Sequence, residues 1–379
     1  MADAPVTETR IEVPQTDLDD LAERLARARW PEPATVDGWR QGIPLDYLQA
    51  LVGHWRTTYD WRAREAAFNR LPQVRTVVDG VGIHAFHVPS PVPGALPLVL
   101  THGWPGSFVE FMELVGPLTD PAAFGGDPAD AFSVVVPSLP GYGWSDKPVE
   151  AGWGVERIAD AWAELMGRLG YDRFAAQGGD WGATVTTALG ARHADRVVGI
   201  HLNMVVAFPG PDDGDPTEDE IDGLAAFAHY QAEEAGYSTQ QRTRPQTVGY
   251  ALVDSPVGQC AWIVEKLAAW SDTDGDPVAA FGADRVLDNV MVYWLTRSGA
   301  SSARLYWESF ASPPAAPVEV PMGAAIFPKE LFRASQRWAA RQYRDIRRWE
   351  RMPRGGHFAA LEQPELLLHE VREFFRPLR

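Results

Sequence analysis

The sequence is poor in cysteine and lysine: its 379 residues include one cysteine, Cys260, and three lysines. A single cysteine excludes an internal disulfide framework and a metal site built from several cysteines, and we expect Cys260 to be a core residue. The nine histidines show no paired spacing typical of metal ligands, so no metal site is expected. No run of about 18 apolar residues occurs, and the sequence therefore predicts no membrane-spanning helix.

The charge balance is acidic, with a formal net charge of -17 at pH 7. Because phosphate binding needs a basic face, a nucleic-acid partner is excluded. Residues 1–10 lack the apolar segment of a signal peptide, so we expect a cytoplasmic protein without a membrane partner. Apolar residues make up 45% of the chain, which is typical of a globular protein with a large core. A homodimer is left open.

The pattern of apolar residues changes along the chain. Residues 15–70 have apolar side chains at helical spacing, and residues 74–88 alternate like a hairpin around Asp79-Gly80. From about residue 95, short apolar runs alternate with helical stretches, which predicts a mainly parallel sheet covered by helices. The alternation stops after Asn203 and returns near Gly323.

These patterns predict an α/β fold in three parts. We expect an N-terminal helical arm over residues 1–90, a core over residues 91–204 and 316–379, and a helical cap over residues 205–315. The cap would lie over the C-terminal edge of the sheet. Within it, the acidic and turn-rich segment Pro211–Asp222 is expected to be a solvated connection.

The sharpest local motif surrounds Asp180, in the segment Gln177-Gly-Gly-Asp-Trp-Gly-Ala183. The segment follows a predicted strand and begins a predicted helix. Small residues two before and two after Asp180 allow a strained turn and close helix packing, and they leave the aspartate side chain exposed. This arrangement is typical of a nucleophile elbow with aspartate in place of serine. The alternative is that Asp180 is simply a helix N-cap.

Two loops would complete such a site. His357 follows two glycines in a loop before the last helix, where the histidine of an α/β-hydrolase belongs, although an isolated loop histidine is usually a surface residue. The loop His102–Gly106 directly follows a predicted strand and can aim backbone N–H groups at the reacting centre. The oxyanion hole would then combine the amides of Trp104 and Trp181. We expect His102 to hold the loop in place.

Together these motifs resemble the epoxide hydrolases of the α/β-hydrolase superfamily, specifically the microsomal type with an N-terminal helical domain. The matching segments cover most of the chain in order: His102-Gly-Trp-Pro-Gly-Ser-Phe-Val-Glu-Phe111, Gly178-Gly-Asp-Trp-Gly182, Thr243-Arg-Pro-Gln-Thr-Val-Gly249, Asp254-Ser-Pro-Val-Gly258, Phe327-Pro-Lys-Glu330 and Gly355-Gly-His-Phe-Ala-Ala-Leu-Glu362. Membrane-bound members carry an N-terminal anchor, and this chain resembles the soluble bacterial members. The resemblance implies an α/β-hydrolase fold with a helical cap insertion and an N-terminal helical extension.

The resemblance also implies three further site residues. It places the acid that orients the histidine at Glu330. From the residues alone, Glu330, Asp345 and Glu350 all remain candidates, and Glu330 could instead be a carboxylate in the first turn of a helix. The resemblance places two catalytic tyrosines in the cap, at Tyr237 and Tyr306, although a tyrosine in a helix is usually a packing residue.

An aspartate nucleophile restricts the reaction. Its ordinary pKa of about 3.9 leaves it ionised at neutral pH, so no base is needed to activate it. Attack on an ester carbonyl would give an anhydride, whereas attack on a saturated carbon gives an ester on the enzyme. His357, oriented by Glu330, would then take a proton from the water that hydrolyses this ester. The reaction needs no cofactor.

The leaving group separates two enzyme classes. An epoxide opens to an alkoxide, which needs a neutral acid such as a tyrosine of ordinary pKa about 10, whereas a halide needs no proton. Tyr237 and Tyr306 therefore favour an epoxide hydrolase that converts a small-molecule epoxide to a vicinal diol. A haloalkane dehalogenase, which shares the aspartate elbow, and a hydrolase-fold binding protein that has lost catalysis are the alternatives. The arginine-rich composition is typical of a GC-rich genome, and we keep a role in bacterial natural-product biosynthesis, such as that of enediyne antibiotics, as a hypothesis.

Overall fold

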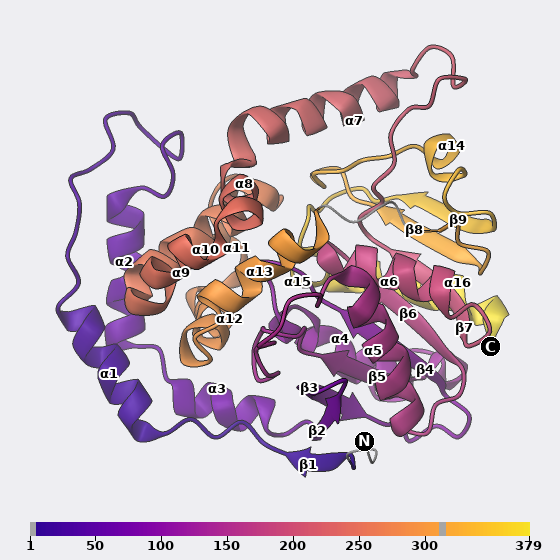
Figure 1. The fold of residues 1–379 in the computed structure, drawn as a ribbon, viewed down its shortest axis with the longest axis horizontal. Coiled ribbons are helices and arrows are strands. Elements are labelled where there is room, and N and C mark those ends of the chain that lie inside the picture. Colours follow the sequence, from indigo (N-terminus) through magenta and orange to yellow (C-terminus); the bar gives the residue numbers. More distant parts are fainter. Residues whose placement is uncertain (1–4, 311–315) are drawn as a thin grey trace.

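Within residues 5–310 and 316–379, which the computed structural model describes, nine strands form one sheet (Figure 1). Their spatial order is β1-β2-β3-β5-β4-β6-β7-β8-β9. The strands are β1 (Thr7–Thr9), β2 (Gln73–Val78), β3 (Val81–Val88), β4 (Leu96–Thr101), β5 (Phe132–Pro137), β6 (Phe174–Gly178), β7 (Val197–Leu202), β8 (Met322–Ile326) and β9 (Ile346–Arg351).

The strands from β4 to β9 pair in parallel, which confirms the predicted mainly parallel sheet. Every residue of β5, β6 and β8 is buried, as their continuous apolar runs require. Four helices pack in two pairs, α5 with α6 and α4 with α16. These helices are α4 (Met112–Thr119), α5 (Val155–Arg168), α6 (Trp181–Arg192) and α16 (Pro364–Phe375).

The other end of the sheet is antiparallel. β2 and β3 form the predicted hairpin, and Asp79 and Gly80 at its turn have φ values of 48° and 79°. Two successive positive φ values suit the right-handed twist of a tight hairpin, and Asp-Gly is one of the favoured pairs. The edge strand β1 pairs antiparallel with β2 and was not predicted, because its short polar sequence has no apolar alternation.

The N-terminal helices lie outside the inserted helices. They are α1 (Gln15–Ala26), α2 (Leu45–Thr57) and α3 (Trp61–Phe68), and they confirm the helices predicted over residues 15–70. Helix α1 packs against α2 and α10 (Pro256–Trp270), and α2 packs against α12 (Ala283–Leu295). Beside α3, the Tyr59 hydroxyl donates to Asp288 of α12 at 2.9 Å, and the Arg64 guanidinium pairs with the same carboxylate. The N-terminal segment therefore braces the helices that follow β7.

The helices between β7 and β8 form a group between the N-terminal helices and the sheet, with α7 extending away from it (Figure 1). They are α7 (Glu218–His229), the π-helical turn η4 (Tyr230–Glu234), α8 (Gly236–Thr243), α9 (Pro245–Asp254), α10 (Pro256–Trp270), α11 (Pro277–Phe281), α12 (Ala283–Leu295) and α13 (Gly299–Ser309). Shorter elements elsewhere are η1 (Phe108–Phe111), η2 (Pro121–Phe124), η3 (Pro128–Asp130), α14 (Gln336–Ala339), α15 (Ala359–Glu362) and η5 (Arg376–Leu378).

The predicted limits of the three parts stay a prediction. Residues 1–4, at the start of the predicted arm, and residues 311–315, at the end of the predicted cap, lie outside the described residues.

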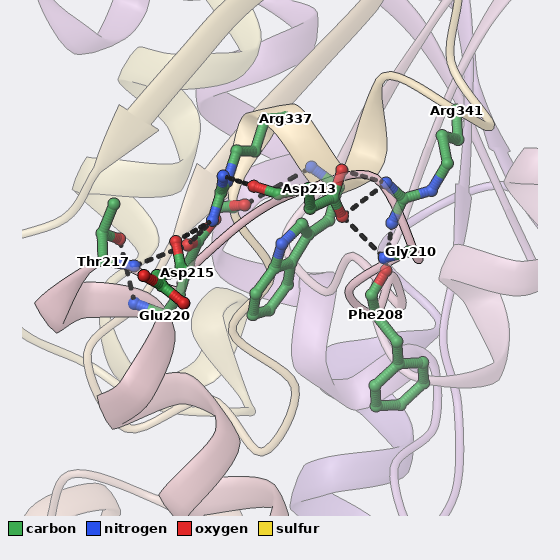
Figure 2. Close-up of polar contacts among 10 residues, drawn as sticks. Phe208, Gly210, Asp213, Asp215, Thr217, Glu220, Arg337 and Arg341 are labelled. Atoms are coloured by element: carbon green, nitrogen blue, oxygen red, sulfur yellow. Dashed lines mark hydrogen bonds and ion pairs between the residues drawn. The ribbon is translucent and has the colours of Figure 1, made fainter.

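The segment before α7 is tied to arginines that lie far along the chain (Figure 2). Arg337 of α14 forms an ion pair with the buried Glu220. Arg341 holds the Asp213 carboxylate at 2.6 Å. Ten of the twelve residues in Pro211–Asp222 are exposed, so the prediction of a solvated segment is confirmed. Its ion pairs with Arg337 and Arg341 could not be identified from local sequence.

Two expectations from composition can be compared with the structure. Cys260 lies in α10 and is fully buried, which confirms that it is a core residue. Among the described residues, no helix has both the length and the apolar character needed to cross a bilayer.

Candidate active site

Asp180 lies in the turn between β6 and α6, with φ 50° and ψ -130°. A positive φ is costly for a non-glycine residue, so the surrounding structure must hold this turn. The neighbouring glycines permit it through close backbone contacts. A Cβ atom at Gly178 would overlap the carbonyl of Gly182, and a Cβ atom at Gly182 would overlap the carbonyl of Thr101. The small residues of the motif are thus needed for packing around the turn.

The Asp180 carboxylate points toward the loop after β4. Its Oδ1 accepts a hydrogen bond from the Trp104 backbone N–H at 2.7 Å. In the described structure the side chain makes no capping bond to the first turn of α6, so the helix N-cap alternative is not supported. His102 Nε2 accepts from the Leu139 N–H at 3.2 Å, which ties this loop to the chain after β5. The oxyanion-hole role of the Trp104 and Trp181 amides stays a prediction.

His357 lies between two carboxylates. Its Nδ1 is 2.8 Å from Oε1 of Glu330, and its Nε2 is 3.3 Å from Oδ2 of Asp180. His357 and Glu330 are 4% and 2% exposed, so water cannot screen this pair effectively. The geometry brings together the three residues that the sequence singled out, and Glu330 is the candidate acid that reaches the histidine.

The charges around His357 oppose the effect of burial on its pKa. Burial lowers the pKa of the imidazole, but the charge and hydrogen bond of Glu330 and those of Asp180 outweigh it and raise the pKa well above the ordinary value. The resting site therefore favours an imidazolium between two carboxylates. Loss of the Asp180 charge would remove part of this stabilisation and make the histidine less basic.

The loop that carries His357 is fixed by a carboxylate that sequence reasoning missed. Glu362 accepts hydrogen bonds from the backbone N–H groups of Gly356 and Phe358, both at 2.9 Å. The His357 N–H itself donates to the Trp270 carbonyl at 2.9 Å. Glu362 lies within the segment that carries the family resemblance, so its presence there was the available signal.

Tyr237 of α8 and Tyr306 of α13 face each other on the cap side of the site. Their hydroxyl oxygens are 3.4 Å apart, and both side chains are buried. The Tyr237 ring stacks on Trp104 at 4.6 Å, while the Tyr306 ring meets Trp181 edge-on at 4.9 Å. These ring contacts place the two phenols above the loops that hold Asp180. Burial, followed by nearby tyrosine and Asp180 charges, raises the pKa of both phenols well above the ordinary value, so both are neutral donors.

A third tyrosine joins this pair. The Tyr230 hydroxyl lies 3.1 Å from that of Tyr237, at the start of the π-helical turn η4. The sequence predicted this region as part of a helical cap, and the π-helical turn lies between α7 and α8. No local pattern marks this residue, and its proximity to Tyr237 is visible only in three dimensions.

A small, partly enclosed cavity lies beside the nucleophile and the histidine. Its volume is about 10 Å³, and Asp180, His357, Trp104, Asn203 and Glu110 are among the residues that line it. That volume is about the least that can hold one water molecule.

Comparison with known proteins places the chain in a family. Residues 6–111 match the family model described as epoxide hydrolase N terminus, and residues 97–309 match that of the alpha/beta hydrolase fold. A Stigmatella aurantiaca relative, whose own name assigns it provisionally to the epoxide hydrolases, is 53% identical over 99% of this chain and 86% of its own. Epoxide hydrolase 1 of Sus scrofa is 34% identical over 98% of this chain and 89% of its own. This chain belongs to the epoxide hydrolase family.

Solved structures agree with that assignment. The juvenile hormone epoxide hydrolase of the silkworm Bombyx mori superposes with a TM-score of 0.92 at 30% identity, over 100% of this chain and 95% of its own. The epoxide hydrolase of Aspergillus niger gives a TM-score of 0.89 at 31% identity, over 98% and 96%. The predicted α/β-hydrolase fold and enzyme class are confirmed, and they displace the dehalogenase and binding-protein alternatives.

Proposed function

We propose that this epoxide hydrolase converts an epoxide and water to a vicinal diol through an ester on Asp180. The observation that carries the proposal is the position of one carboxylate. Oδ1 of Asp180 accepts from the Trp104 amide, and Oδ2 lies 3.3 Å from His357 Nε2. A carboxylate fixed next to a base and below two phenols suits attack on a saturated carbon followed by hydrolysis.

In the first step an Asp180 oxygen forms a bond to an epoxide carbon, and the C–O bond of the ring breaks. The electron pair moves to the epoxide oxygen, which takes a proton from the tyrosine pair. The support is that Tyr237 and Tyr306 are buried, neutral and 3.4 Å apart at their hydroxyl oxygens. Two donors at that spacing can both reach one oxygen atom. The phenolate that forms regains its proton before the next turnover.

In the second step water attacks the carbonyl carbon of the ester. Ester formation removes the Asp180 charge, so one of the interactions that raise the pKa of His357 is lost and its neutral form becomes accessible. Nε2 then accepts a proton from the water, while Glu330 stabilises the resulting imidazolium. The Trp104 amide, with that of Trp181, would hold the oxyanion until the ester C–O bond breaks and the diol oxygen leaves with a proton from His357.

The substrate class is inferred from the rings around the two tyrosines. Trp104 stacks on Tyr237, and Trp181 and Phe310 pack against Tyr306. Apolar, aromatic surroundings of this kind suit an epoxide with an apolar substituent. The role in bacterial natural-product biosynthesis, the cytoplasmic location and the homodimer stay hypotheses, and the neighbouring genes would address the first.

His357→Gln tests the two-step mechanism. The glutamine cannot act as the base, so ester hydrolysis should slow by about 10³-fold while ester formation continues. After addition of styrene oxide, the intact mass should rise by that of one substrate, with the added mass on the peptide that contains Asp180. The exposed His369→Gln is the control and should turn over normally. Absence of an adduct, or an adduct on another residue, would overturn the proposed route.

A further inference from the structure

Glu110 is an acidic side chain at the active site for which the two-step reaction has no role. It lies in η1, the 3-10 helix directly after the His102–Gly106 loop, and lines the 10 Å³ cavity together with Asp180 and His357. Its carboxyl group folds back over that loop: a Cβ atom at Gly106 would overlap Glu110 Oε1. The glycine therefore makes room for the carboxyl group next to the nucleophile.

The cavity has the size and the partners that a single water needs. A water requires about 10–15 Å³ and between two and four polar partners. His357 Nε2, the Asp180 carboxylate and the Glu110 carboxyl group all belong to residues that line this space. In the second step of the reaction the water must touch both His357 and the Asp180 ester carbonyl. The cavity is therefore suited to the hydrolytic water.

Glu110 also borders a second space. Together with Ala360 it lines a surface crevice of about 360 Å³ that borders α3 and α12. The same residue therefore lines both the cavity and the crevice.

We propose that Glu110 positions the hydrolytic water between His357 and the Asp180 ester, an inference that rests on the proposed two-step mechanism. One O–H bond of the water points to the Glu110 carbonyl oxygen and the other to His357 Nε2. A lone pair of the water oxygen then faces the ester carbon. During attack the water oxygen bonds to that carbon, and one proton passes to His357. Glu110 acts by orientation and neither gains nor loses a proton.

The charge state of Glu110 suits this role. Burial raises its pKa to about 8; the Asp180 and Glu362 charges act in the same direction, while His357 and the Ser107 backbone N–H act against it. At neutral pH the group is a neutral acid, so it adds no negative charge beside the developing oxyanion. The other charged residues that line the crevice are Arg64, Arg70, Glu113, Arg285 and Asp288.

The test separates the two chemical steps in single-turnover experiments with excess enzyme and styrene oxide. In Glu110→Leu, ester formation should stay within about 2-fold of wild type, while ester hydrolysis should slow by about 10²-fold because the water loses its orientation. Glu110→Gln keeps a neutral donor and acceptor and should restore most of the hydrolysis rate. Glu113→Leu, which removes a neighbouring exposed carboxylate, should leave both rates unchanged.

The pH profile provides a second readout that does not depend on the leucine variant folding. In wild type, ester hydrolysis should fall at alkaline pH as Glu110 ionises, and this fall should disappear in Glu110→Gln. An equal slowing of both steps in the leucine variant, or a fall that persists unchanged in the glutamine variant, would overturn the role of Glu110. If no ester formed in any variant, including His357→Gln, the two-step mechanism itself would fail and this inference with it.

Discussion

The core and the cap hold their active-site groups in different ways. On the core side, Asp180, Glu330 and His357 lie on loops after strands, and backbone contacts fix them: Glu330 N–H donates to the Phe327 carbonyl and His357 N–H to that of Trp270. On the cap side, Tyr237 and Tyr306 lie on helices and are placed by the rings around them. The nucleophile half is therefore held by hydrogen bonds, and the acid half by ring packing.

This difference separates the two chemical steps. In the proposed mechanism the core groups supply the nucleophile and the base, whereas the tyrosines protonate the epoxide oxygen as the ester forms. Substitutions on the core side should therefore slow ester hydrolysis, or both ester formation and ester hydrolysis. Substitutions on the cap side should slow ester formation alone.

Asp180→Ala should cause the largest loss. Without the carboxylate no ester can form, so turnover of styrene oxide should fall by at least about 10⁴-fold. Steady-state diol formation measures this, with the exposed Asp195→Ala as the control. Wild-type turnover in the alanine variant would show that the core half does not contain the nucleophile.

Replacing both tyrosines by phenylalanine should cause a smaller and more selective loss. The Tyr237→Phe, Tyr306→Phe variant lacks a proton donor for the alkoxide, so ester formation should slow by about 10³-fold. Hydrolysis of an ester once formed should stay within about 3-fold of wild type, because neither phenol contacts the water in the proposed route.

Rapid-quench measurement of the ester follows both rates. Tyr171→Phe serves as the matched control, because it removes a hydroxyl that binds His87, outside the site. Equal slowing of both steps in the double variant would remove the distinction between the two halves.

The ion pair between Arg337 and Glu220 can be removed without changing any active-site residue. Arg337→Ala would leave the Glu220 carboxylate without its cation, which should lower the free energy of unfolding. The Arg337 hydrogen bond lowers the pKa of Glu220 to about 2, below its ordinary value. The stabilisation is therefore present above the ordinary pKa and is lost as pH falls toward 2.

Urea denaturation at several pH values measures this effect. The difference between wild type and Arg337→Ala should be full at pH 7 and shrink below about pH 4. The exposed Arg344→Ala should change stability much less. A difference that does not depend on pH would mean that the Arg337–Glu220 ion pair is not its source.

The same contrast explains what the sequence could predict. The elbow around Asp180 and the glycines before His357 are local patterns, because a tight turn restricts the residues on either side of it. Glu330 could not be chosen over Asp345 or Glu350 without the resemblance, since proximity to a histidine is a long-range property. In the structure Asp345 pairs with Arg347, and Glu350 lies 3.8 Å from Arg348.

On the cap side, local sequence carried almost no information. Tyr237 and Tyr306 were predicted only through the resemblance, and Tyr230 was missed. Glu110 sits in a mostly apolar segment and gains its environment from α15 and from the His357 loop. The strand and helix pattern of the core was predictable because buried parallel strands and amphipathic helices repeat regularly. Contacts between distant segments have no such regularity.

The most direct test of the covalent aspartate is a single turnover in ¹⁸O-labelled water with enzyme in excess over styrene oxide. The diol oxygen that leaves with the first product comes from Asp180, and the water oxygen stays in the carboxylate. We expect an unlabelled first diol and ¹⁸O in the peptide that contains Asp180, with label reaching the diol only in later turnovers. A first diol that carries ¹⁸O, with no label in that peptide, would show that water attacks the epoxide directly and would contradict the ester mechanism.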